Sequence, residues 1–318
     1  MENIIKTALA RYVRLIKQGI TDYRWLLFYI QRIDYNPERR RFISSIIANL
    51  LPKTIGHQLS PEAQKLNKTL DEDGVVVLNN FVDKTQVEEM RAYLATKLCL
   101  DPQRPEMGRF SSPDLAPKVT FHAYYTNEDA ASLPHLWELA NDPTILSIIE
   151  ERFGAKPTIS FLAVWWKLND FDPEANANLR SFAKPEEFHR DVDDWSEIKL
   201  FIYLNDVDES TGPHGFIKSS HKWFLPPRSR ALDLDCSNFP MKDNLAKITG
   251  EAGMAWLENS YVLHRGMVVT ARPRLIISVV YTLFPGPHSP KTPILTCPDR
   301  NRFDPYINRV YLRDSNPQ

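Results

Sequence analysis

The chain has 318 residues, of which 43% are hydrophobic and 25% are charged. This length and composition allow a buried core in one large domain or two modest ones, so the protein should be globular. Its 39 basic and 40 acidic residues give a net charge of -1, which gives no reason to expect a nucleic-acid partner. Cys99, Cys236 and Cys297 are widely spaced, which argues against a disulfide framework or a zinc ribbon and favours a reducing cytoplasm.

The N-terminal part of the chain differs in charge from the rest. Residues 1–60 contain ten basic and four acidic side chains, a net charge of +6. Apolar residues recur at helical spacing from Ile5 to Ile16. We therefore expect residues 1–65 to form a basic helical extension packed on a main domain of residues 66–318. A peripheral contact of this extension with a membrane or a partner is the less favoured alternative. The longest apolar run here is far too short to span a bilayer.

Local signals then predict a strand and two helices. The β-branched run at 75–77 follows an Asp-Gly pair and predicts a strand. Asp83 with Gln86 three residues later is the pattern of a capping box and predicts the start of a helix. Asp142 as N-cap and Gly154 just past the last turn delimit a second helix. We expect these helices to flank a sheet.

Beyond Pro157 the chain is predicted to consist of strands joined by turns. The long crossover helices of a parallel α/β fold are missing, so an antiparallel sandwich or jelly roll is favoured. The predicted fold class is therefore mostly β with flanking helices. The expected strands are Ile159–Leu168, Glu187–Val192, Ile198–Asn205, His214–Lys218, Met254–His264 and Arg274–Phe284.

Two histidines and an aspartate are candidate metal ligands. His189 and Asp191 should point to the same side of a strand, because side chains two residues apart share a face. A lone His-x-Asp triplet is weak evidence, but His264 follows a later apolar segment and supplies a third ligand. Such a set leaves one face of the ion open. This suits Fe(II) with a chelating cosubstrate and O2 better than zinc.

Arg274 stands ten residues after His264, at the start of a strongly apolar strand. A guanidinium in this position needs a partner, and a carboxylate matches its donors best. Taken alone, a structural salt bridge is the more common explanation. Lys199 and Tyr203 share one face of their strand, so either side chain is a candidate to reach a cosubstrate.

Taken in order, these motifs resemble the phytanoyl-CoA dioxygenase-like (PhyH) family of Fe(II)/2-oxoglutarate-dependent oxygenases. The resemblance covers about residues 66–290. Its elements are Leu70–Leu78, Phe188–Asp191, Lys199–Asp208, Gly212–His214, Ser219–Lys222, Leu263–Gly266 and Arg274.

The resemblance implies a double-stranded β-helix, which is a cupin-like jelly roll, with iron bound by His189, Asp191 and His264. It also implies that Arg274 binds the distal carboxylate of 2-oxoglutarate. Arg272 remains a rival for this role, and Ser278 is a candidate second contact. The implied reaction hydroxylates an unactivated C–H bond of a small-molecule, lipid-type or sugar-type substrate and releases succinate and CO2.

Two other classes of function stay open at this point. A zinc or other divalent-metal cupin-like hydrolase or isomerase would use the same three ligands without needing Arg274. A non-catalytic binding protein on this scaffold would act through its basic N-terminal helices. His214 and His221 lie near the motifs, but the resemblance assigns neither to the metal, so turn or supporting roles are expected.

Overall fold

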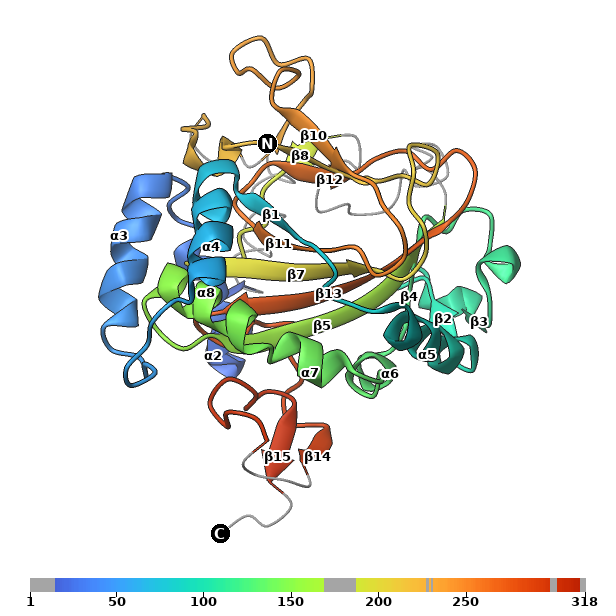
Figure 1. Cartoon of the computed structure of the whole chain (residues 1–318), viewed down its shortest axis with the longest axis horizontal. Coiled ribbons are helices and arrows are strands. Elements are labelled where there is room, and N and C mark those ends of the chain that lie inside the picture. The colour runs from blue at the N-terminus through green and yellow to red at the C-terminus, as the bar shows by residue number, and fades with distance from the viewer. Residues whose placement is uncertain (1–14, 169–186, 227–228, 230, 298–301, 315–318) are drawn as a thin grey trace, which may run out of the picture.

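Two antiparallel sheets form the centre of the computed structural model, which describes residues 15–168, 187–226, 229, 231–297 and 302–314 (Figure 1). In spatial order, the larger sheet contains β1 (Val75–Leu78), β11 (Ala255–Asn259), β7 (Glu197–Tyr203), β13 (Arg274–Thr282), β5 (Thr158–Lys167), β4 (His122–Tyr124), β2 (Cys99–Leu100) and β3 (Arg109–Phe110). The smaller sheet contains β10 (Leu245–Ile248), β8 (His214–Ile217), β12 (His264–Gly266), β6 (Phe188–His189) and β9 (Ala231–Leu232). A short parallel pair, β14 (Leu295–Cys297) and β15 (Leu312–Asp314), lies apart from both.

Helices cover the outer side of the larger sheet and form a layer at one end of it (Figure 1). The covering helices are α4 (Pro61–Asp73), α5 (Lys84–Ala95), α6 (Asn127–Ala131), α7 (Leu136–Ala140) and α8 (Pro143–Phe153). The end layer contains α2 (Tyr23–Gln31) and α3 (Pro37–Ala48). Three 3-10 turns complete the described elements, η1 (Pro105–Met107), η2 (Pro113–Leu115) and η3 (Ser220–Lys222).

Alternation along the central strands separates a core from a cavity. On β7, Leu200 and Ile202 belong to the hydrophobic core beneath the helices, whereas Lys199 and Phe201 face the cavity between the sheets. Successive side chains of a strand point to opposite faces, so one strand serves both surfaces. Strand β13 repeats this pattern, because Ile277 joins the core while its neighbours on either side line the cavity.

Most predicted elements are present, with two informative differences. Asp83 and Gln86 form the predicted capping box of α5. The apolar spacing also predicts a buried stripe of Val87, Met90, Leu94 and Leu98, but Leu98 is exposed because the helix ends at Ala95. The strand predicted over 254–264 is broken in two. Strand β11 ends in the larger sheet, the chain turns at Ser260–Leu263, and β12 begins in the smaller sheet. This crossing between sheets places His264 on the wall of the cavity that lies opposite the larger sheet.

The fold is therefore the predicted mostly-β jelly roll with flanking helices. No helix among the described residues is long and apolar enough to cross a membrane.

Candidate active site and metal centre

Three side chains able to hold a metal ion converge between the two sheets. Strand β6 pairs with β12 so that His189 lies opposite His264, with ring centres 4.8 Å apart. Nε2 of His189 lies 3.8 Å from Oδ1 of Asp191, and Nε2 of His264 lies 3.4 Å from Oδ2. Ligands that share one ion at about 2.1 Å lie about 3 to 4 Å apart, so this spacing fits a metal. The described part of the chain contains no other such group.

The segment that carries two of these ligands is only partly a strand. We predicted one strand over 187–192, but β6 ends at His189, and Asp191 lies beyond it. The backbone N–H of Asp191 donates to the carbonyl of Ser260 (2.9 Å), in the turn between β11 and β12. Arg190 is fully buried, and its guanidinium donates to two backbone carbonyls. The direction of Asp191 is thus set by a buried arginine and a turn rather than by regular strand pairing.

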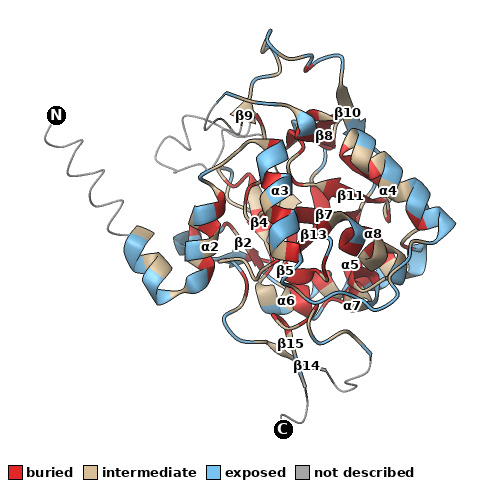
Figure 2. Cartoon of the chain, turned by 90° about the vertical axis from the view of Figure 1, so that its left-hand side faces the viewer, coloured by how far each residue is buried: buried red, intermediate tan, exposed pale blue. Residues whose placement is uncertain are grey.

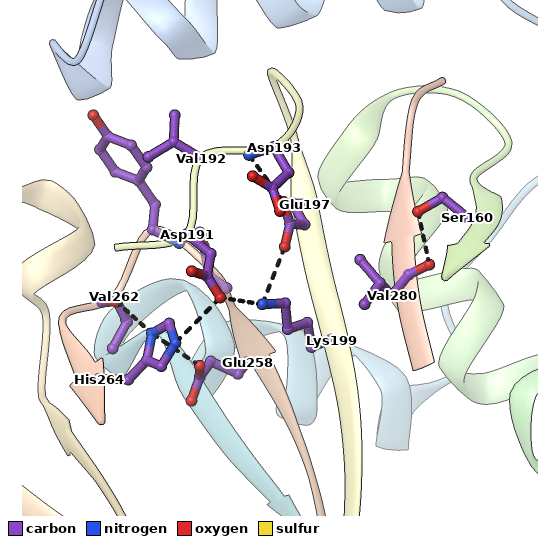
Figure 3. Close-up of polar contacts among 12 residues, drawn as sticks. Ser160, Asp191, Val192, Asp193, Glu197, Lys199, Glu258, Val262, His264 and Val280 are labelled. Carbon is purple, nitrogen blue, oxygen red and sulfur yellow. Dashed lines mark hydrogen bonds and ion pairs between the residues drawn. The ribbon is translucent and has the colours of Figure 1, made fainter. Parts of the chain in front are cut away.

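Lys199 lies beside the metal group, between two carboxylates (Figure 3). Its Nζ contacts Oδ2 of Asp191 and lies 3.3 Å from Oε1 of Glu197. Burial opposes the lysine charge, but the two carboxylates outweigh it and raise the pKa of Lys199. Burial likewise opposes the charge of Asp191, yet Lys199 and the two histidines hold its pKa well below the usual range. Asp191 is therefore ionised, as a metal ligand must be.

Glu258 supports His264 from behind, and sequence reasoning missed it. This carboxylate is fully buried on β11, with Oε1 3.3 Å from Nδ1 of His264 and Oε2 2.6 Å from Nε2 of His214. Nδ1 of His264 also lies 3.0 Å from the carbonyl of Val262 (Figure 3). These contacts leave Nε2 of His264 facing Asp191. A glutamate within an otherwise apolar strand was the available sequence signal.

A cavity of about 310 Å³ extends from the metal group along the inner face of the larger sheet. Its walls combine aromatic and aliphatic side chains with a few charged ones, the composition usual for small-molecule sites. Among the lining residues are Phe161, Trp165, Lys199, Phe201, Arg274, Ile276 and Ser278.

Arg274 and Arg272 differ sharply in their surroundings. Arg274 is 3% exposed, donates to the carbonyl of Gly212 and lies 5.7 Å from the ring centre of Tyr203. Its Nε has no hydrogen-bond partner, and no described carboxylate pairs with it. The Arg272 side chain is instead 64% exposed and pairs with Asp208 at the surface (3.3 Å). Arg274 alone of the two lines the cavity.

The other expected cosubstrate contacts lie in different places. Ser278 lines the cavity on the same face of β13 as Arg274. Tyr203 lies outside the lining, where its hydroxyl donates to the carbonyl of Ile248 (3.0 Å) and accepts from the N–H of His214 (2.8 Å). His221 lies away from the metal group, with Nε2 3.1 Å from a backbone carbonyl. The group of possible metal ligands among the described residues includes neither His214 nor His221.

The N-terminal helices hold the segment that follows Asp191. Gln31 Nε2 donates to the carbonyl of Val192 (2.5 Å), and Arg32 Nε donates to the same carbonyl (2.7 Å). Arg32 also pairs with Asp193 (2.7 Å), and Arg40 Nη2 donates to the carbonyl of Asp194 (2.6 Å). The end layer is therefore part of the framework of the site.

We expect Gln31→Leu to destabilise the protein by about 1 to 3 kcal/mol, because it removes a buried donor from Val192 and leaves Arg40 with one acceptor fewer. Urea unfolding of the apoprotein measures this change. The same substitution at the exposed Gln64 of α4 is the control, with an expected change within about 0.5 kcal/mol. Equal effects of the two substitutions would contradict the role given to Gln31.

Asp194 ties this segment to the end of β13. Its Oδ2 accepts from the N–H groups of Leu283 (2.7 Å) and Phe284 (2.9 Å). Burial is the dominant effect and raises the pKa of Asp194 to about 6, from 3.8 in a solvated chain. The folded protein therefore retains a proton that the unfolded chain releases between these two values.

The stability from this proton should be complete below about pH 4 and lost as the pH rises through 6. We expect the free energy of unfolding of the wild type, relative to Asp194→Asn, to fall by about 3 kcal/mol at most between pH 4 and 7. Urea unfolding of both proteins across this range, with a chelator present, measures the difference. A difference that does not vary with pH would show that Asp194 does not titrate in this way.

Solved structures with a related fold extend over most of the chain. EctD from S. alaskensis, in its apoform, has 18% sequence identity over 83% of this chain and 91% of its own, with a TM-score of 0.50. HygX from Streptomyces hygroscopicus, with nickel and 2-oxoglutarate bound, has 17% identity over 76% of this chain and 91% of its own, with a TM-score of 0.48. The epimerase SnoN from nogalamycin biosynthesis has 18% identity over 70% and 83%, with a TM-score of 0.47.

Comparison with curated protein sequences finds no match. The family model described as phytanoyl-CoA dioxygenase (PhyH) matches residues 70–275, which is well over half of the chain and includes all three candidate ligands. The N-terminal helices α2 and α3 precede the matched region. The chain therefore belongs to the phytanoyl-CoA dioxygenase (PhyH) family.

Proposed function

We propose that this protein is a non-haem Fe(II)/2-oxoglutarate-dependent dioxygenase that hydroxylates an unactivated C–H bond of a small molecule. Family membership and the His/Asp/His group support a 2-oxoglutarate-dependent iron enzyme. In this proposal His189, Asp191 and His264 hold the iron. When bound, iron and 2-oxoglutarate would supply the activation of O2, with succinate and CO2 as the products of the cosubstrate.

The observation that carries the proposal is the buried and incompletely paired Arg274. A guanidinium that is 3% exposed and lacks a carboxylate partner among the described residues is costly unless a ligand supplies one. Arg274 and Ser278 line the same cavity as the metal group, so we propose that a dicarboxylate held at the metal by one end pairs with Arg274 at the other. Gly266 keeps this corner open, because a Cβ there would lie 3.1 Å from Nη2 of Arg274.

The surrounding residues prepare the site before any ligand arrives. Glu258 and the Val262 carbonyl hold the ring of His264, and such supporting contacts fix the orientation and basicity of a ligating histidine. Lys199 balances the negative charge of Asp191. Phe161, Trp165 and Phe201 make part of the cavity wall aromatic.

Asp191 also bears on the type of reaction that we propose. Asp191 retains a carboxylate at the position where related halogenases have a small residue, so we propose hydroxylation rather than halogenation.

A zinc hydrolase or isomerase with the same ligands would leave Arg274 without a function. A non-catalytic scaffold would need neither Arg274 nor the complete metal group. The free thiols of Cys99 and Cys236 support a reducing, cytoplasmic location for the enzyme.

Anaerobic titration of the apoprotein with Fe(II) and then 2-oxoglutarate tests the proposal. We expect a weak visible charge-transfer band that requires both additions, and conversion of 2-oxoglutarate to succinate once O2 is admitted. A zinc hydrolase or isomerase, or a non-catalytic binding protein, would show no band and no calorimetric binding of 2-oxoglutarate. That result would overturn the proposed oxygenase function. A screen of small-molecule substrates by mass increase then tests hydroxylation separately.

A further inference from the structure

The outer side of the N-terminal layer carries an unusual concentration of exposed apolar side chains. Of fifteen large hydrophobic residues that are exposed in the described chain, ten fall between residues 16 and 55. They are Ile16, Ile20, Tyr23, Leu26, Ile30, Ile33, Phe42, Ile46, Leu50 and Ile55. We call this set the apolar face. Several of its members are nearly as exposed as in an unfolded chain, with Ile20 at 81% and Leu50 at 83%.

The spacing of these residues shows that the apolar face is organised. Tyr23, Leu26 and Ile30 lie three and four residues apart on one side of α2, whereas Arg24, Phe28 and Gln31 on its other side are buried against the main domain. Helix α3 repeats this arrangement with Phe42 and Ile46 exposed and Arg40 and Ser44 buried. Figure 2 shows exposed ribbon along both helices on this side of the molecule. Each helix therefore has one face that packs against the main domain and a second, apolar face that has no partner among the described residues.

The exposed charged residues around the apolar face are mainly basic. Lys17, Arg41 and Lys53 are exposed there against Glu38, and the exposed Arg39 is paired with Asp34. Two further arginines, Arg24 and Arg40, point inward and are used in holding the main domain. Exposed apolar side chains interspersed with lysine and arginine are typical of helices that lie in the interface of an anionic membrane.

We propose that the apolar face docks on an anionic lipid surface and holds the enzyme there as a peripheral protein. Self-association through this face is less favourable, because a two-fold contact would bring two net-positive surfaces together. An anionic surface instead complements the cations while the apolar side chains enter the boundary of the bilayer. The inner side of the same helices contacts the segment after Asp191 and the carbonyl of Ser289, a residue that lines the cavity. Docking would thus place the end of the cavity near the membrane.

Sedimentation of the full chain with vesicles tests this proposal. One vesicle preparation contains phosphatidylcholine alone, and the other contains equal parts of phosphatidylcholine and phosphatidylglycerol. We expect binding to the mixed vesicles, weaker binding to the neutral ones, and loss of binding as salt is raised. The double variant Arg41→Gln/Lys53→Gln should weaken binding roughly five-fold for each charge removed. Ile20→Gln/Ile30→Gln should weaken it by about ten-fold or more.

Leu115→Gln is the matched control, because it removes an exposed leucine far from the N-terminal layer in sequence. It should bind vesicles like the wild type. All variants should retain the charge-transfer band with Fe(II) and 2-oxoglutarate, so that a change in binding is not a loss of the active site. Failure of the wild type to bind mixed vesicles would overturn the proposal. The proposal would also be overturned if the wild type formed a dimer that the double variant Ile20→Gln/Ile30→Gln dissociates. Neither result would bear on the proposed reaction.

Discussion

Asp191→Ala is expected to weaken binding of Fe(II) by about 100-fold or more and to abolish turnover. Loss of a contact that merely supports a ligand costs about 10-fold to 100-fold in metal affinity, and the loss of a ligand should exceed this range. The substitution also removes the carboxylate that lies closest to Lys199, so this buried cation would face the two histidines with Glu197 as its remaining ion-pair partner among the described residues. Both effects act against a divalent cation at this position.

Competition between the apoprotein and a coloured chelator, under anaerobic conditions, measures this affinity. Asp193→Ala is the matched control, because it removes a carboxylate two residues away that pairs with Arg32 rather than with the metal group. Its Fe(II) affinity should stay within a few-fold of the wild type. If Asp191→Ala bound Fe(II) as tightly as Asp193→Ala, the proposed metal centre would be wrong.

Arg274→Met is expected to weaken binding of 2-oxoglutarate by about 30-fold to 5000-fold while leaving Fe(II) binding intact. Truncation of one partner of a buried charge pair costs about 2 to 5 kcal/mol, and a methionine fills similar space without the charge. The cost arises because the distal carboxylate of the cosubstrate would lie in a desolvated corner without its cation. The metal ligands lie on β6, on β12 and just after β6, outside β13, and should not move.

Calorimetric titration of 2-oxoglutarate into the iron-loaded protein, without O2, measures the loss. Arg272→Met provides the control, since it removes the same charge only two residues away at the surface. It should bind 2-oxoglutarate as the wild type does. Equal losses in both variants would point to a general effect of net charge, and a larger loss in Arg272→Met would transfer the role to that residue.

The N-terminal layer precedes the region that the family model matches, and its two sides have different roles. Its buried side supplies Gln31, Arg32 and Arg40 to the segment after the metal-binding aspartate. Its outer side carries the apolar face. We therefore propose that residues 15–65 are a functional extension of the oxygenase domain rather than a passive appendage. The Gln31→Leu and vesicle experiments test the two sides separately.

Several features were determined by the sequence itself, because they depend on local physics. The capping box of α5 and the two caps of α8 act between residues a few positions apart, and the alternation along β7 and β13 follows from strand geometry alone. The order of the motifs was also sufficient to identify the family. The candidate ligands His189, Asp191 and His264 were all found in this way, and the structure brings them together.

The tertiary structure decided what depends on contacts between distant segments. Sequence spacing placed Asp191 on a strand, but its position depends on buried Arg190 and the turn at Ser260. The burial of Arg274 and the exposure of Arg272 could not be distinguished from their spacing, because the start of β13 is set by its pairing with β5.

Glu258 became visible only when β11 was placed behind His264. The same holds for the N-terminal helices, whose amphipathic pattern predicted a buried side but not which segment it would hold. Periodicity specifies which face of an element is apolar. The partner of that face is chosen by packing over the whole chain, where burial and charge pairing act between residues more than a hundred positions apart.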